Sequence, residues 1–180
     1  MDRNAGLGDD GMATWSMRLR VDGLSCRRGL RRVVSGAAFT VEPGGVVELR
    51  GPNGSGKSTL LRALAGLLPL ESGEARLGDA ALTRERDAYQ EQVAYAGHLD
   101  AVKPSLSFQE NLTFWAQFFG AERLDAEEEA ARALRLLNLA GMADAPAAHG
   151  SAGQRRRLGL ARLAVIERPL WLLDEPTSSL

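Results

Sequence analysis

The 180-residue sequence has few of the residues that build disulfides and metal centres, and it lacks a long apolar run. It contains one cysteine, Cys26, and two histidines. A single cysteine excludes a disulfide framework within the chain and leaves no cysteine pair with metal-ligand spacing. No stretch reaches the roughly 18 apolar residues that a membrane-spanning helix needs, and no apolar signal segment opens the chain. These absences predict a soluble protein of the reducing cytoplasm.

An excess of one charge is also lacking. The chain has 22 Lys and Arg against 23 Asp and Glu, so its formal net charge is -1. Because the chain has no excess of basic residues, its composition does not indicate a nucleic-acid partner. With 44% hydrophobic residues, the chain is long enough to bury one sizeable core. We expect one domain.

Strand and helix patterns alternate along the chain. Strands are predicted at 17–21, 37–41, 46–50, 92–96 and 170–173 from alternating or continuous apolar residues. Helices are predicted after residue 57 and after two capping boxes, Ser107 to Glu110 and Ser151 to Gln154, with a further helix from 125 to a stop at Gly141. This order predicts an α/β fold with helices concentrated between 100 and 155.

A glycine-rich stretch, GPNGSGKS, fits the pattern G-x-x-x-x-G-K-[ST] without mismatch. A chance match in a chain of this length is below about one in a hundred. The glycines let backbone N–H groups point at phosphate oxygens, Lys57 reaches the β- and γ-phosphates, and the Ser58 hydroxyl ligates Mg²⁺. We therefore predict an ATP site formed by Gly51, Pro52, Asn53, Gly54, Ser55, Gly56, Lys57, Ser58 and Thr59.

The apolar run LWLL at 170–173 ends in two carboxylates. A buried strand of an α/β sheet presents its carboxyl end to ligands, so Asp174 is predicted to hold Mg²⁺ through water. Glu175 is predicted to act as general base on the attacking water. The alternative is a strand that ends in a charged turn.

A second anion-binding helix end is predicted at GSAGQ, where Ser151 caps a helix. Because the phosphate loop already serves a nucleotide in cis, a second end suggests closure onto a nucleotide held by another subunit. A plain capped surface helix is the alternative. The arginines at 155–157 that follow are interpreted as a solvated or subunit-contacting face, and a catalytic role is the alternative.

Taken in order, these motifs resemble those of the ATP-binding cassette (ABC) ATPases, from about residue 17 to the end. GPNGSGKST is similar to their Walker A motif, GSAGQ to the signature loop, LWLLDE to Walker B, and PTSSL to the start of the D-loop. The resemblance implies ATP hydrolysis by a homodimer with Mg²⁺. It also implies that the signature residues Ser151, Ala152, Gly153 and Gln154 meet the nucleotide in trans.

Within that family, AGHLDAVKPSLSFQENLTFW resembles the ATPases of cytochrome c maturation, the CcmA family. His98 stands where most ABC ATPases have the Q-loop glutamine, which implies a place near the γ-phosphate and the membrane partner. A neutral imidazole can orient a water or support an Mg²⁺ ligand as an amide does. Taken alone, His98 is an ordinary loop histidine.

The sequence departs from the family pattern at the signature loop, where Gly150 and Ala152 replace a leucine and a glycine. No aromatic residue follows the first strand to stack on adenine, so Arg28 is the candidate there. Trp115 and its phenylalanine neighbours are expected in the core of the helical insert, or else in a groove that receives a permease helix.

The expected fold is α/β, a P-loop NTPase (ABC ATPase) core with an inserted helical subdomain at about 100–155. Residues 1–16 are expected to be a disordered leader, with Met1, Met12 or Met17 as the start. The ABC ATP-binding domain is expected at 17–180. Because LLDEPTSSL breaks off inside the resembled D-loop, this domain is expected to be incomplete at its C-terminus.

The resemblance implies an ATPase subunit that works with membrane-embedded permease subunits of a cytochrome c maturation complex. It implies a peripheral location on the cytoplasmic face of the bacterial inner membrane, and coupling of hydrolysis to haem export or to release of haem from its carrier. No residue pattern itself points to haem. The alternatives are the ATPase of another ABC exporter, a soluble non-transport ABC protein, and a nucleotide-binding regulator without turnover.

Overall fold

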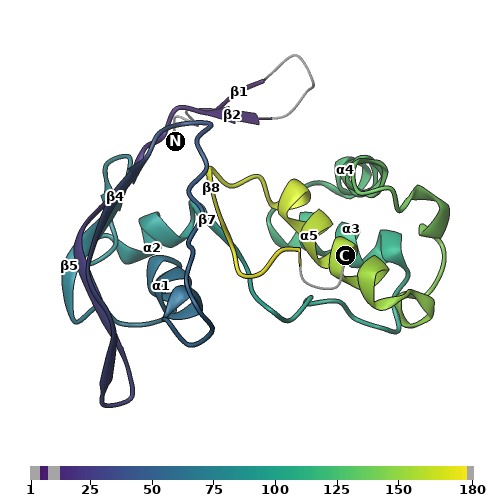
Figure 1. The fold of residues 1–180 in the computed structure, drawn as a ribbon. Helices are drawn as coiled ribbons and strands as arrows, with labels where there is room; N and C mark the ends of the chain where they lie inside the picture. Colours follow the sequence, from purple (N-terminus) through teal and green to yellow (C-terminus); the bar gives the residue numbers. More distant parts are fainter. Residues whose placement is uncertain (1–4, 8–12, 178–180) are drawn as a thin grey trace. The chain divides into compact units, whose positions relative to one another are not determined.

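The computed structural model describes residues 5–7 and 13–177 (Figure 1). The chain divides into two compact units. The first unit comprises Met1–Tyr95 and Arg168–Asp174, and the second comprises Ala96–Glu167 and Glu175–Leu180. The chain therefore passes between the units after Tyr95, after Glu167 and after Asp174.

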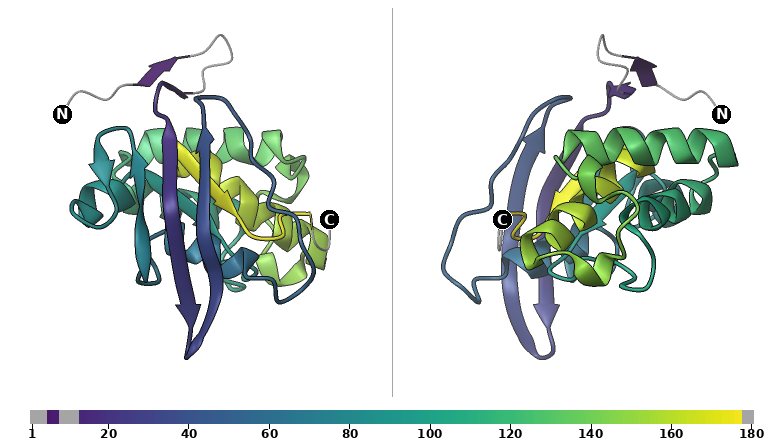
Figure 2. Two further views of the ribbon diagram at one scale, coloured as in Figure 1. Left: turned by 60° about the vertical axis from the view of Figure 1, so that its left-hand side comes forward. Right: turned by 90° about the vertical axis from the view of Figure 1, so that its right-hand side faces the viewer.

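A four-stranded antiparallel sheet forms one side of the first unit, in the order β4-β3-β5-β6. Its two long strands lie side by side as a hairpin (Figure 2). Along β3, Leu19 and Val21 are buried while Arg20 and Asp22 are exposed, which is the alternation expected of a strand with one face on the core. The strands are β3 (Leu19–Arg28), β4 (Arg31–Val41), β5 (Ser72–Leu77) and β6 (Ala80–Ala81).

Two further strands, β7 (Val93–Ala96) and β8 (Leu170–Leu173), form a separate two-stranded sheet. Helix α1 (Lys57–Leu64) buries Leu60, Ala63 and Leu64 in the core of the first unit. A short helix that the sequence did not predict, α2 (Arg86–Gln90), buries Tyr89. These elements place the phosphate-loop sequence and the end of β8 in the same unit.

Two predictions for the first unit need correction. Residues 46–50 are not a strand: Val46 is 93% exposed, and no ladder to another described strand includes this segment. Valine favours strands only where a neighbouring strand and a packed face exist, so propensity alone misled the prediction. In the leader, β1 (Ala5–Leu7) and β2 (Ala13–Trp15) pair antiparallel where no regular structure was expected.

The second unit is helical, with α3 (Phe108–Phe118), α4 (Arg123–Leu136) and α5 (Ala152–Ile166) packed on one another. Two short 3₁₀ turns, Ala140–Met142 and Ala147–His149, connect α4 to α5. Both predicted capping boxes are confirmed, at Ser107 and at Ser151. The predicted stop of α4 at Gly141 is wrong, because Asn138 at φ 54° already ends it, and asparagine tolerates this left-handed conformation.

Buried leucine, alanine and phenylalanine side chains form the core of the second unit, among them Phe108, Leu112 and Leu134. None of the helices within residues 13–177 is long and apolar enough to cross a bilayer.

Candidate functional site

The glycine-rich loop at 51–56 folds into a turn that leads directly into α1. Gly54 and Gly56 have φ angles of 80° and 101°, which other residues rarely adopt. A Cβ on Gly56 would lie 2.7 Å from the carbonyl oxygen of Val33, so only glycine fits there. The backbone of Leu60 then donates to Gly56 O at 2.8 Å and starts the helix. The first N–H groups of α1 have no partner within the helix, which is the arrangement that binds anions.

The ammonium group of Lys57 folds back over this loop. Its Nζ donates to the carbonyl oxygens of Gly51 at 2.8 Å and Pro52 at 3.1 Å. The side chain therefore already lies against the backbone of the loop. Phosphate oxygens carry more negative charge than carbonyl oxygens, so they would compete favourably for the same ammonium.

A hydrogen-bond network joins the start of α1 to the end of β8. Ser58 Oγ donates to Asp174 Oδ1 at 2.8 Å, and Tyr95 OH donates to Asp174 Oδ2 at 3.3 Å. Arg62 Nε in turn donates to Tyr95 OH at 3.4 Å. Asp174 is only 4% exposed, so this carboxylate depends on its hydrogen bonds. The two predicted Mg²⁺ ligands are therefore in direct contact.

Sequence reasoning missed Tyr95 and Arg62. Burial raises the pKa of Tyr95, and the hydrogen bond from Arg62 opposes this, so the phenol stays protonated and can donate to Asp174. A tyrosine inside a short buried strand needs a partner for its hydroxyl, and that signal was present in QVAYA.

The donor set at Ser58 and Asp174 fits Mg²⁺. Both groups offer oxygen, which hard divalent cations prefer, and Mg²⁺ commonly takes only one or two protein ligands beside phosphate oxygens and water. Among residues 5–7 and 13–177, no cluster of three or more His, Cys, Asp or Glu side chains could hold a metal by itself. The pair is therefore suited to an ion that arrives with a nucleotide.

The two predicted catalytic residues belong to the second unit. Glu175 follows the unit boundary, is exposed, and has φ 52°, a conformation that is uncommon outside glycine. His98 is exposed in the loop after β7. Their position relative to the phosphate loop stays a prediction.

The signature-like residues form the N-terminus of α5. Gln154 N donates to Ser151 Oγ at 3.1 Å, and Ser151 N donates to Gln154 Oε1 at 2.7 Å. Ser151 and Ala152 are exposed, and Gly153 is half-buried. The end of the helix is therefore both ordered by its cap and open to a ligand.

The interpretation of residues 155–157 as a solvated or subunit-contacting face is wrong for Arg156. Arg156 is buried, at 4% exposure, and binds Gly97 O, Asp100 and Glu175 O. Arg155 donates to Gly150 O, and Arg157 donates to Leu137 O at 3.2 Å. All three guanidinium groups bind main-chain oxygens of the second unit.

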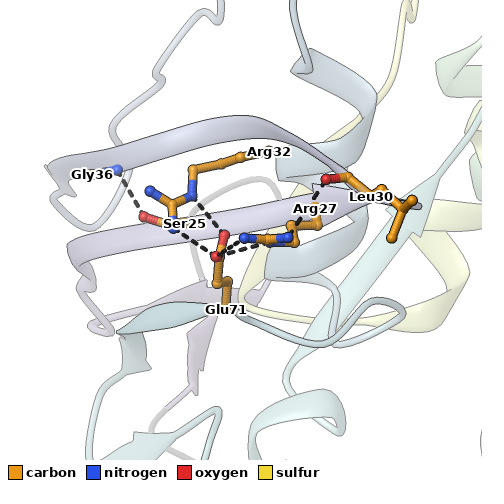
Figure 3. Close-up of polar contacts among 6 residues, drawn as sticks. All are labelled: Ser25, Arg27, Leu30, Arg32, Gly36 and Glu71. Atoms are coloured by element: carbon orange, nitrogen blue, oxygen red, sulfur yellow. Dashed lines mark hydrogen bonds and ion pairs between the residues drawn. The ribbon is translucent and has the colours of Figure 1, made fainter.

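A charged cluster fixes the β3–β4 hairpin (Figure 3). The carboxylate of Glu71 lies between Arg27 and Arg32, with contacts of 2.8 and 2.6 Å. The hydrogen bond from Arg32, helped by Arg27, lowers the pKa of Glu71 to about 2. Arg28, the candidate for stacking on the base, is exposed at the end of β3.

The aromatic residues of α3 are mainly at the surface, so the expectation that they form core is wrong for the phenylalanines. Phe114 is 51% and Phe118 67% exposed. Trp115 is half-buried and stacks under the guanidinium of Arg162, 4.9 Å from the ring centre. An open groove of about 400 Å³ runs beside them, lined by Leu106, Gln109, Glu110, Thr113, Phe114, Gln117 and Glu127.

Comparison with known proteins places these features in a family. The family model described as "ABC transporter" matches residues 34–178. The cytochrome c biogenesis ATP-binding export protein CcmA of Nitrobacter hamburgensis is 51% identical over 166 residues, which are 91% of this chain and 79% of that protein. The protein of the same name from Paracoccus denitrificans is 51% identical over 162 residues, covering 90% and 69%.

Solved structures agree with the sequence matches. An ATP-binding subunit of an ABC transporter superposes with a TM-score of 0.77 at 28% identity, covering 89% of this chain and 67% of that chain. An ATP-binding cassette in its ADP conformation superposes with a TM-score of 0.76 at 23% identity and supports the fold alone. The predicted fold class, an α/β P-loop NTPase of the ABC type, is confirmed.

Proposed function

The chain belongs to the ABC transporter family, among the cytochrome c biogenesis ATP-binding export proteins, and we propose that it hydrolyses ATP to drive a membrane complex of cytochrome c biogenesis. The observation that carries the proposal is the identity of about half of all residues over nine-tenths of the chain. The hydrogen bond of Ser58 to Asp174 supports it, because it joins the phosphate loop to a carboxylate that suits Mg²⁺.

The phosphate loop binds ATP through its backbone and Lys57. Backbone N–H groups of residues 53–59 and the positive end of α1 face the phosphates, and Lys57 exchanges its two carbonyl partners for phosphate oxygens. Ser58 and Asp174 hold Mg²⁺, Asp174 through water. When bound, this ion neutralises charge on the phosphate oxygens.

Glu175 acts on the attacking water, and His98 couples ATP hydrolysis to the membrane partner. The carboxylate of Glu175 orients the attacking water and accepts its proton. His98 replaces the usual glutamine of the Q-loop, and its imidazole holds a water or an ion ligand and responds to the membrane partner.

Two copies of the chain close on two nucleotides. The exposed end of α5, with Ser151, Ala152, Gly153 and Gln154, meets the phosphates bound by the partner copy. The aromatic surface on α3 and its groove accept a segment of a membrane-embedded permease subunit. On this proposal the protein binds peripherally at the cytoplasmic face of the inner membrane, and the complex exports haem or releases it from a carrier.

Two substitutions test ATP hydrolysis. Lys57→Ala removes the charge that contacts phosphate, so ATP affinity should fall. Glu175→Gln keeps the binding groups, so affinity should remain while turnover falls by about 10²–10⁴. Lys103→Ala removes the same charge as Lys57→Ala from an exposed loop position of the second unit and serves as the matched control. Unchanged turnover in Glu175→Gln would remove this residue from the mechanism.

The link to cytochrome c is tested in cells. Purification from membranes should recover the chain with a hydrophobic permease, and Glu175→Gln should abolish formation of haem-loaded c-type cytochromes. Normal cytochrome c levels beside an inactive ATPase would favour another ABC exporter.

A further inference from the structure

Arg156 is a buried charge that donates hydrogen bonds to two segments with predicted functional residues, the loop 97–100 and Glu175. Its side chain retains only 5% of its accessible surface. Removing a guanidinium group from water is costly unless partners compensate. Nη1 donates to Gly97 O at 2.8 Å and to Asp100 Oδ1 at 3.2 Å, and Nη2 donates to Glu175 O at 2.8 Å. The first two partners flank His98, and the third belongs to the proposed general base.

Two backbone features show that these segments sit tightly on α5. A Cβ on Gly159, one turn beyond Arg156, would lie 2.6 Å from Asp100 O, so the loop 97–100 rests directly on the helix. Glu175 has φ 52°, and a non-glycine residue keeps this conformation only where its surroundings hold it. The bond from Arg156 to its carbonyl oxygen supplies such support.

The two carbonyl groups that Arg156 binds lie next to points where the chain enters the second unit. The first passage lies between Tyr95 and Ala96, so Gly97 is the second residue after it. The other passage lies between Asp174 and Glu175, so Glu175 is the first residue after it. Within the first unit, Tyr95 donates a hydrogen bond to Asp174, and Asp174 accepts a second hydrogen bond from Ser58 beside the phosphate loop. A shift of α5 would therefore act on both passages at once.

We propose that Arg156 is a positioning residue for ATP hydrolysis. Its guanidinium group holds the loop 97–100, which contains His98, and Glu175 against α5, the helix capped by Ser151. When a nucleotide binds at the N-terminus of α5, any shift of that helix then moves the carboxylate of Glu175 through the guanidinium group of Arg156. The inference rests on the proposed ATPase function. It assigns Arg156 no contact with ATP.

The test compares Arg156→Lys with Arg157→Lys in the assembled complex. Lysine keeps the charge but cannot reach two segments with a planar fork, so Arg156→Lys should lower kcat by about 10- to 100-fold, the size expected from a misplaced reactive group. The Kd for ATP should stay within about threefold, because the phosphate loop is untouched. Arg157→Lys, which loses one bond to Leu137 O just after α4, should leave kcat within about twofold.

A second pair of variants tests the same contact between the loop 97–100 and α5 without altering a charge. Gly159→Ala pushes the loop 97–100 off α5, whereas an added Cβ on Gly141 meets nothing within 4 Å. Gly159→Ala should lower kcat with ATP affinity kept, and Gly141→Ala should not. Because alanine favours helices, Gly159→Ala remains informative if Arg156→Lys fails to fold.

The outcomes separate the inference from the proposed function. A parent complex that does not hydrolyse ATP overturns both. An active parent, an inactive Lys57→Ala variant, and Arg156→Lys or Gly159→Ala with parental kcat overturn only the role of Arg156. Equal losses of kcat in the Arg156 and Arg157 variants would also overturn it, because they would indicate a general packing effect.

Discussion

Two serines with the same structural task allow stability and function to be separated. Ser107 caps α3 and Ser151 caps α5, each with φ near -65° and ψ near 165° to 169°. The hydroxyl oxygens accept from the N3 backbone at 3.0 and 3.1 Å, and both return bonds to the cap N–H measure 2.7 Å. Serine to alanine at either position removes one hydrogen bond of equal geometry.

The loss of stability should therefore be the same. Replacing an N-cap serine by alanine costs about 1 kcal/mol, within a range of roughly 0.5–2. For a chain of this size, 1 kcal/mol lowers the melting temperature by about 2–4 °C. Thermal and urea unfolding of Ser107→Ala and Ser151→Ala should give changes that agree with each other.

The loss of activity should differ. The Ser151 oxygen accepts the bond from Gln154, but its O–H proton is still available for a phosphate oxygen of the partner's nucleotide. A hydrogen bond to a charged group contributes about 1.5–3 kcal/mol, which corresponds to a decrease in turnover of about 10- to 150-fold. Ser107→Ala should hydrolyse ATP at nearly the parental rate. Equal decreases in both variants would refute a role of Ser151 beyond capping.

Two further predictions concern His98 and Glu71. His98→Gln should keep ATPase activity and cytochrome c maturation, since an amide replaces the hydrogen bonding, while His98→Ala should keep hydrolysis and lose maturation; equal loss of both activities in both variants would contradict a coupling role. Because the folded-state pKa of Glu71, about 2, lies below the ordinary 4.5, its ionised form stabilises the fold above about pH 4.5, and this contribution is lost as the pH falls towards 2. Melting temperatures should therefore fall more steeply with acidification in the parent than in Glu71→Gln, and parallel curves would exclude the ion pairs as the cause.

Features that depend on a few neighbouring residues were predictable from sequence. Each capping box needs only a serine and a Glu or Gln three residues later, and both formed as predicted. The contact of Ser58 with Asp174 spans 116 residues, yet it follows from the rule that ligand groups gather at the carboxyl ends of strands. Tyr95 was missed because its partners, Asp174 and Arg62, lie far from it along the chain.

The strand expected at 46–50 failed for a different reason. Alternation and valine content describe what a segment does once it is paired, and they do not say whether a partner strand is present. Val46 has no such partner among the described residues and stays 93% exposed. A strand at 46–50 would need hydrogen bonds to a neighbouring strand, and only the arrangement of the whole sheet shows whether that neighbour exists.

For Arg156, burial could be predicted from the sequence, but its hydrogen-bond partners could not. Successive residues of a helix point about 100° apart, so three consecutive arginines cannot all face solvent on a helix packed on both sides. Arg156 shares its face with the buried Gly159 and Leu163, a spacing that already indicated burial of this arginine. Two of its partners, however, are the carbonyl oxygens of Gly97 and Glu175, and every residue carries a carbonyl oxygen. No side-chain pattern marks such partners, so only the path of the chain could identify the arginine that holds them.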